Sequence, residues 1–182
     1  MAQKPISAEL YTTSHRILCR LNPGPSGIFS FLNIPTRSYL EVEGAHLTQL
    51  HQPGKMVARF PTLWVVKNRI VAMLLSGRVE LGPTAGARGG YLTQSPTLVH
   101  ILLGGYELRG SVETGGKFNF GALMFEGTSI FIPLYDAELM AILFPNVRAQ
   151  SPAILFNREM VDAIGLLPKD GVASDGVASA AS

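Results

Sequence analysis

Short apolar runs separated by glycine and proline turns make up most of the chain, and their spacing is that of β-strands. Tyr39, Glu41 and Glu43 alternate with Leu40 and Val42. A period of two predicts a strand with one buried face, because successive side chains point to opposite sides of a sheet. Further runs of β-forming residues predict strands at 17–21, 63–66, 69–75 and 97–103, with a hairpin at the polar pair 67–68.

Two short segments combine a preceding glycine or proline turn with helical spacing. Phe29 and Leu32 follow the turn at 22–25, and Phe120 and Leu123 follow a similar turn. A spacing of three residues places both side chains of each pair on one face of a helix. Because a helix of barely two turns is marginal by itself, each one is predicted to pack on the sheet.

The same order of strand, glycine turn, short apolar helix, strand, proline and strand occurs twice along the chain. Shifting the second part back by 91 positions superposes the two series, with a slip of one residue after the helix. We interpret this pattern as an internal duplication, because similarity at a fixed period is the sequence signature of repeats. The segments that superpose are 17–21 on 108–112, 28–33 on 119–124, 39–42 on 131–134 and 61–65 on 152–156.

Stretches rich in glycine and small residues divide the chain into four predicted parts. Residues 1–75 form the first β-rich copy, and residues 91–169 form the second. Residues 76–90 between them are rich in glycine and predict a mobile linker. Residues 170–182 carry a tandem Asp-Gly-Val-Ala-Ser sequence with few large apolar side chains, so we predict a disordered tail.

These parts together predict the fold class. A unit of about 60 residues is marginal as an independent domain, and it leaves strand edges open to aggregation. Packing two copies against each other covers those edges. We therefore predict a mainly β fold with short helices (a β-rich α+β fold), in which two similar small barrel-like or half-sheet units form a covalent pseudo-dimer.

Several of the same residues match the pattern of a known group of domains. His15-Arg-Ile17, Phe31-Leu-Asn33 and Asp136-Ala137 resemble a group of short uncharacterised bacterial domains with the pattern His-Arg-Ile-x-Gly, Phe-Leu-Asn and Asp-Ala. The first copy has Cys19 in place of the glycine and Gly44 in place of the aspartate, and the second copy lacks the His-Arg pair. No catalytic residues come with this group, so the resemblance implies a bacterial protein and an architecture only.

A second similarity is to Sm-like small β-barrels. The segments 65–70 and 134–137 resemble the strand pair that ends those barrels. The chain departs from the Sm pattern because its helix follows the first predicted strand and because it has no basic RNA-binding loop. RNA binding is therefore not carried over to this chain.

Composition narrows the classes of partner. Lysine and arginine number 15 and aspartate and glutamate 13, which gives a net charge of +2. This balance argues against a nucleic-acid partner, because neutralising phosphates takes clustered cations. No apolar run reaches the roughly 20 residues that cross a bilayer, and the N-terminus has no apolar run of signal-peptide length. We expect a cytoplasmic protein without a membrane span.

The single cysteine and the four histidines do not form a recognisable site. One cysteine excludes an internal disulfide and any zinc site built from several cysteines. Cys19 lies in a strand-like run, where a small packed residue is expected more often than a nucleophile. His15, His46, His51 and His100 lack the His-x-x-x-His spacing of a metal site. We expect no metal and no cofactor.

The carboxylates and the glycine-rich stretch carry no catalytic pattern either. Glu41 and Glu43 point to the same side of one strand, which is typical of a solvated face. Asp136 is the one acid near a predicted strand end in the second copy, and Gly44 replaces it in the first. Residues 82–90 lack the Gly-Lys-Ser/Thr of a phosphate-binding loop. We therefore assign no catalytic residue.

Three functions remain open on this basis. The first is a non-enzymatic adaptor, scaffold or regulatory module that binds a protein partner through its β surface or an open strand edge. The alternative is a module that binds a small anionic ligand, such as a nucleotide, in the cleft between the copies, since basic residues are concentrated in the first copy. An enzyme of unknown chemistry is the third. A homo-oligomer is compatible with each of them.

Overall fold

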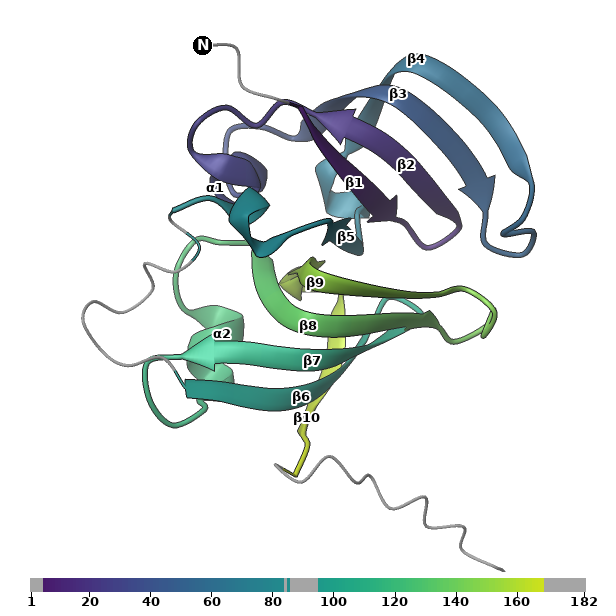
Figure 1. The fold of residues 1–182 in the computed structure, drawn as a ribbon. Helices are drawn as coiled ribbons and strands as arrows, with labels where there is room; N and C mark the ends of the chain where they lie inside the picture. The colour runs from purple at the N-terminus through teal and green to yellow at the C-terminus, as the bar shows by residue number, and fades with distance from the viewer. Residues whose placement is uncertain (1–4, 84, 86–94, 169–182) are drawn as a thin grey trace, which may run out of the picture.

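The computed structural model describes residues 5–83, 85 and 95–168, which fold as a mainly antiparallel β structure with short helices. Ten strands form one open sheet in the order β10-β6-β7-β8-β9-β5-β1-β2-β3-β4 (Figure 1). The first five strands are β1 (Ile6–Tyr11), β2 (His15–Leu21), β3 (Tyr39–Gln49), β4 (Met56–Val66) and β5 (Ala72–Leu75). The others are β6 (Ser95–Leu103), β7 (Tyr106–Thr114), β8 (Phe131–Ala141), β9 (Arg148–Asn157) and β10 (Val161–Leu166).

Five helical segments connect these strands. Each of the two α-helices lies where the spacing of apolar residues predicts a short helix. Both are only six residues long. α1 is held by packing, since Ile28 and Leu32 are completely buried. In α2 only Met124 is buried, and Phe120, which was predicted to pack on the sheet, is exposed. The helices are α1 (Gly27–Leu32) and α2 (Phe120–Phe125), and the 3₁₀ turns are η1 (Lys67–Arg69), η2 (Arg78–Leu81) and η3 (Arg158–Met160).

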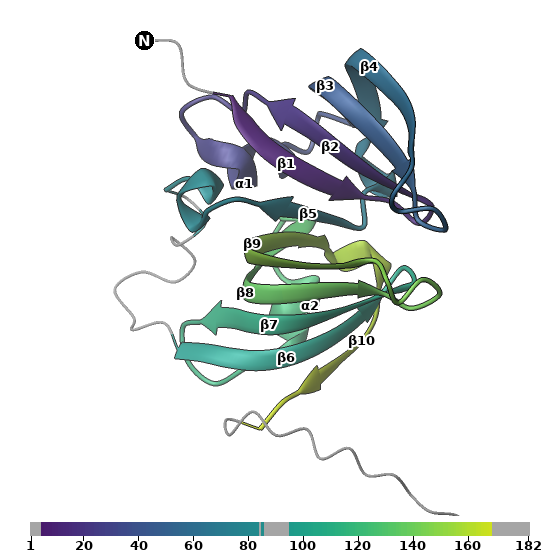
Figure 2. The ribbon, with the colours of Figure 1, turned by 45° about the vertical axis from the view of Figure 1, so that its right-hand side comes forward.

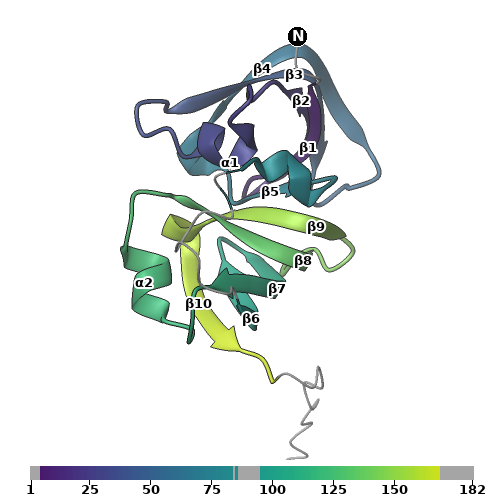
Figure 3. The same ribbon diagram turned by 60° about the vertical axis from the view of Figure 1, so that its left-hand side comes forward.

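The strands of the first and second halves follow the same order. The first half runs β5-β1-β2-β3-β4 across the sheet, and the second runs β10-β6-β7-β8-β9. In Figures 2 and 3 the two sets lie one above the other and meet along β5 and β9. The sheet therefore ends in β4 on one side and in β10 on the other.

The pairing registers of the two halves also correspond. β1 pairs Tyr11 with Arg16, and β6 pairs Leu102 with Glu107, 91 positions further on in both strands. The irregularity that follows Leu18 in the β2–β3 pairing has its counterpart after Arg109 in the β7–β8 pairing. The correspondence thus extends from strand order to individual residue pairs.

One backbone position shows why the two halves can differ in residue type and keep the same geometry. Gly44 in β3 and Asp136 in β8 occupy corresponding positions, and both have positive φ, 56° and 46° respectively. This left-handed conformation suits glycine, and aspartate tolerates it better than most residues. Asp136 is the one described residue other than glycine with positive φ.

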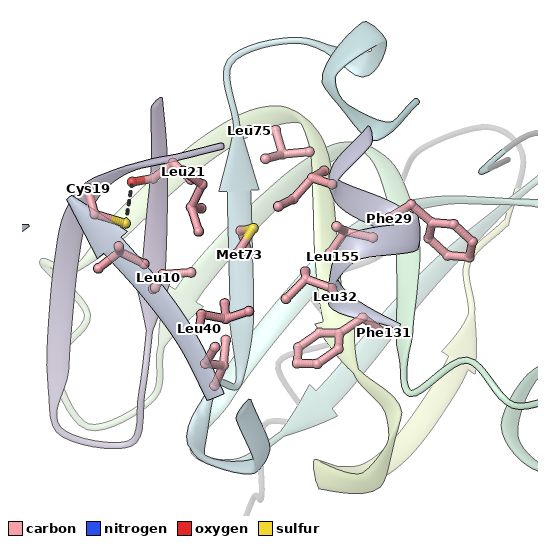
Figure 4. Close-up of a cluster of buried hydrophobic side chains, with 14 of the residues drawn as sticks. Leu10, Cys19, Leu21, Phe29, Leu32, Leu40, Met73, Leu75, Phe131 and Leu155 are labelled. Atoms are coloured by element: carbon pink, nitrogen blue, oxygen red, sulfur yellow. Dashed lines mark hydrogen bonds between the residues drawn. The ribbon is translucent and has the colours of Figure 1, made fainter. Parts of the chain in front are cut away.

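The junction of the halves is an antiparallel pair between β5 and β9. Residues 72–75 pair with residues 153–156, and all eight are buried. Met73 and Leu155 belong to the core cluster under β1–β4, whereas Ala72 and Phe156 belong to the cluster of the second half. Figure 4 shows Leu155 beside the side chains of the first half. Because alternate residues enter different cores, this strand pair holds the two cores together.

A second contact between the halves comes from the end of α1. The Asn33 side chain donates a hydrogen bond from Nδ2 to the carbonyl oxygen of Phe131, at 3.0 Å. Its Oδ1 accepts from the Phe131 backbone N–H at 2.8 Å. Phe131 begins β8 and is fully buried in the core of the first half. Asn33 thus fixes the start of a second-half strand against a first-half helix.

The strand pattern differs from the sequence prediction in two places. β1 was not predicted; it is the counterpart of β6, the run at 97–103. The predicted hairpin at 67–68 is wrong, because η1 carries the chain across and β5 pairs with β1 and β9 instead of β4. Lys67 lies at this break, and its Nζ donates a hydrogen bond to the Ile34 carbonyl oxygen at 2.7 Å.

The predicted linker contains a packed element. Within residues 76–90, the turn η2 contacts α1, and Leu81 is 2% exposed. Gly27 and Gly82 meet here, with the position of a Cβ on either glycine only 2.4 Å from the backbone of the other segment. Only glycine allows so close an approach. Residues 84 and 86–90, like the predicted tail from residue 170, lie outside the described residues.

Candidate functional site

Strand β4 presents a row of exposed apolar side chains, which we call the β4 edge surface. The largest is Trp64, which is 61% exposed and donates a hydrogen bond from Nε1 to Glu41 at 3.2 Å. Isolated exposed apolar side chains are normal, but several along one strand are typical of an interaction surface. The members of the β4 edge surface are Met56, Val57, Phe60, Trp64 and Val66.

The backbone of β4 is unpaired on the same side. Among the described residues, β4 pairs with β3 alone. The N–H of Lys67 donates inward to the Ser38 carbonyl oxygen, so by strand alternation the N–H groups of Val66 and Trp64 point away from β3. Thr62 has the same outward orientation, whereas Pro61, which has no N–H, lies at a position that faces β3.

Strand β10 is the other end of the sheet and is also open. Within the part of the chain that the structure describes it pairs with β6 alone, and Leu166 at its end is 59% exposed. The N–H of Leu167 donates to the Leu98 carbonyl oxygen on β6. By alternation, the N–H groups of Leu166 and Ile164 point outward. The described chain therefore has two strand edges able to accept another strand.

A groove of about 760 Å³ lies between the halves, and we call it the junction groove. Arg20, His46 and Arg59 line it from three neighbouring strands, and β9 contributes residues 149–152. Arg59 Nε donates to Nε2 of His46 at 2.8 Å. Among the described residues neither Arg20 nor Arg59 forms an ion pair; Glu9, which also lines the groove, pairs with Arg16.

The corresponding groove of the second half has the opposite character. It measures about 660 Å³ and contains Arg109, Asp136 and Glu138. By the register correspondence, Asp136 and Glu138 take the places of Gly44 and His46. The halves differ in the same sense overall: residues 5–83 contain eight Lys and Arg and four Asp and Glu, whereas residues 95–168 contain four and seven.

Cys19 is placed as a packed core residue. It is 6% exposed, and its Sγ lies 3.7 Å from the Ala8 carbonyl oxygen (Figure 4). Burial raises the pKa of the thiol to about 12. Because the thiolate is the reactive form, this environment suppresses nucleophilic chemistry.

The four histidines lie apart from one another. His46 accepts from Arg59, His100 contacts Glu107 at 3.1 Å, and His15 contacts the Ser14 hydroxyl at 2.7 Å. His51 lies beside the Phe144 ring. In the described part of the chain, no three His, Cys, Asp or Glu side chains are grouped closely enough to hold a metal ion.

The carboxylates singled out in the sequence are also separate. Asp136 is exposed and pairs with Arg78 at 2.5 Å, while Arg78 also lies over the Tyr135 ring. Glu41 and Glu43 are exposed along β3, with Glu41 held by Trp64. The contacts of Asp136 belong to a surface ion pair beside η2.

The features that sequence reasoning missed are the β4 edge surface and the convergence of Arg20, His46 and Arg59. The local signal for the β4 edge surface was the run at 63–66, which has apolar residues on both faces. A strand with one buried face requires apolar residues on that face only. The second depends on the registers of β2, β3 and β4, since His46 and Arg59 are direct partners across the sheet.

Comparisons with known protein families, with curated proteins and with solved structures found no match for this chain. Within the described residues, no helix combines the length and apolar character needed to cross a bilayer.

Proposed function

We propose that this chain is a non-enzymatic adaptor or scaffold, built from two copies of one β-rich unit, that binds a protein partner by adding a strand to the β4 edge. The observation that carries the proposal is the coincidence of the outward backbone donors of Thr62, Trp64 and Val66 with the exposed side chains of the β4 edge surface. Strand addition uses both, because backbone hydrogen bonds provide affinity and alternate side chains provide specificity.

The internal correspondence supports the duplicated, pseudo-dimeric part of the proposal. Equal strand order, registers that match over most of each strand pair and the matching positive φ of Gly44 and Asp136 are what two copies of one unit would retain. The cores that meet through β5 and β9 give each unit the cover that a small unit lacks by itself.

The test is affinity capture of the tagged chain from its own cells, followed by mass spectrometry. Wild type is expected to retain one protein partner, and Trp64→Glu is expected to lose it, because a charge replaces the largest apolar contact of the edge. Leu143→Glu is the matched control, since Leu143 is 80% exposed in the β8–β9 connection. Equal retention by wild type and Trp64→Glu would contradict the proposal.

The junction groove supports a second candidate, the binding of a small anionic ligand such as a nucleotide. Its two guanidinium groups have no carboxylate partner in the described chain, and its volume falls within the range of ligand sites. A nucleoside phosphate that raises the melting temperature of wild type and not of Arg20→Ala or Arg59→Ala would favour this function. Absence of a shift with every nucleoside phosphate tried would rule out nucleotides.

A further inference from the structure

We propose that the strand added to the β4 edge is β10 of a second copy of this chain, so that copies join head to tail. The inference rests on the proposed use of the β4 edge and names its partner. Its basis is that the chain already contains this junction once, between β5 and β9. In the register correspondence β4 is the counterpart of β9, and β10 is the counterpart of β5.

The free edges are the correct ones for this pairing. β9 pairs along one edge with β8 and along the other edge with β5. β4 pairs with β3 along the edge that corresponds to the β8 side of β9, and in the described chain its other edge is open. β5 pairs along one edge with β1 and along the other edge with β9. β10 pairs with β6 along the edge that corresponds to the β1 side of β5, and in the described chain its other edge is open. Each open edge therefore matches an edge that is paired inside the molecule.

The internal junction also fixes the register of the proposed one. Leu75 pairs with Ala153, and Met73 pairs with Leu155. Shifting each partner by 91 positions places Leu166 of one copy opposite Thr62 of the next, and Ile164 opposite Trp64. These are the residues whose N–H groups point outward on β10 and β4.

The residues of the two open strands are more exposed than their counterparts at the internal junction, as expected of strands without a partner. At the internal junction residues 72–75 and 153–156 are all buried. Their counterparts on β10, residues 163–166, are exposed or half-buried, and on β4 Trp64 is exposed. In the proposed register Trp64 takes the place of Leu155 and covers Ile164 and Leu166, the counterparts of Met73 and Leu75.

Charge is complementary across the same junction. At the internal junction β9 contributes residues 149–152 to the junction groove. Their counterparts on β4 include Arg59, which would therefore enter the second-half groove of the neighbouring copy. That groove contains Glu138, for which the described chain shows no ion pair. The acidic groove thus receives a cation from the basic half.

The test of the register is disulfide trapping in the full chain. In a Cys19→Ala background, Thr62→Cys combined with Leu166→Cys is expected to give a ladder of linked multimers under mild oxidation. Opposite residues of a hydrogen-bonded antiparallel pair lie about 5.5 Å apart between Cα atoms, within the range of a disulfide. The control pair Thr62→Cys with Leu143→Cys is expected to give no ladder. Equal linking in both pairs, or none in either, would overturn the register.

The association itself is tested by sedimentation of the purified chain over a range of concentrations. Wild type is expected to associate, and Leu166→Pro to associate about tenfold more weakly, because proline removes an outward donor. Its fold is preserved, since that N–H makes no bond to β6. Arg59→Glu is expected to weaken association, and adding Glu138→Arg to restore it.

The outcomes separate this inference from the function on which it rests. A chain that stays monomeric at all concentrations, but captures a different protein through Trp64, overturns the head-to-tail assembly and leaves the β4 edge as a binding site. A monomer that captures nothing through Trp64 overturns both. Association that is equally strong in wild type and Leu166→Pro places the interface elsewhere and also overturns the inference.

Discussion

At the scale of single residues, the environment of each reactive group decides its chemistry more than its type does. Cys19 is the clearest case, because desolvation raises its pKa and keeps the thiol neutral. Desolvation also raises the pKa values of Tyr11 and Tyr106, the two tyrosines whose rings meet edge to face between the halves. All three groups are buried in neutral form, so ionisation opposes folding.

We expect Cys19 to make the fold sensitive to alkaline pH. Because its folded pKa is above the unfolded value of about 9, its contribution to stability is complete below pH 9 and is lost as pH rises toward 12. The loss approaches about 1.4 kcal/mol per pH unit. Urea unfolding at several pH values measures it, and Cys19→Ala should show a shallower decline than wild type above pH 9. Identical declines would contradict this assignment.

At the scale of elements, local patterns predicted what depends on local sequence. The alternation at 39–45 is found as β3, with Leu40, Val42 and Ala45 fully buried, and the spacing of Phe29 and Leu32 is found as α1. β1 was missed although Ile6, Ala8 and Leu10 alternate with Ser7 and Glu9 in the same period of two, because the segment has only six residues and only one β-branched residue. The pairing of β5 with β9 joins residues about 80 positions apart, and no local signal encodes such a contact.

Asn33 provides a test of how one element is fixed to the next. Replacing it with alanine leaves the N–H and carbonyl groups of Phe131 without their partner, which typically costs about 1–3 kcal/mol. We expect Asn33→Ala to lower the free energy of unfolding by that amount in urea titration. Asn68→Ala is the control, since Asn68 is exposed in η1. An equal effect of the two substitutions would show that the contact to Phe131 contributes nothing.

At the scale of the whole molecule, two cores share one strand pair and should unfold together. Leu155 belongs to the second half by sequence and to the first-half core by packing. The candidate sites also depend on how the two halves pack together. The sequence indicated a basic first copy and an open edge, but the junction groove and the two sheet ends depend on how the halves dock, which composition does not specify.

We expect Leu155→Ala to lower the free energy of unfolding by about 2–5 kcal/mol, as for other leucines removed from a core. The single tryptophan, Trp64, reports on the first half, so its fluorescence should follow a substitution made in the second half. Circular dichroism of the whole chain should give the same midpoint. Two separate transitions would contradict the shared core, and Leu143→Ala should leave the midpoint unchanged.

The uneven distribution of charge between the halves has a further consequence. A positive first half and a negative second half give the molecule an electric dipole moment that runs from one end of the sheet toward the other. Such a field acts before contact, because it orients approaching molecules over about a Debye length, roughly 8 Å at physiological ionic strength. A charged molecule that approaches either end of the sheet is oriented by this field, and its association rate falls as the salt concentration rises.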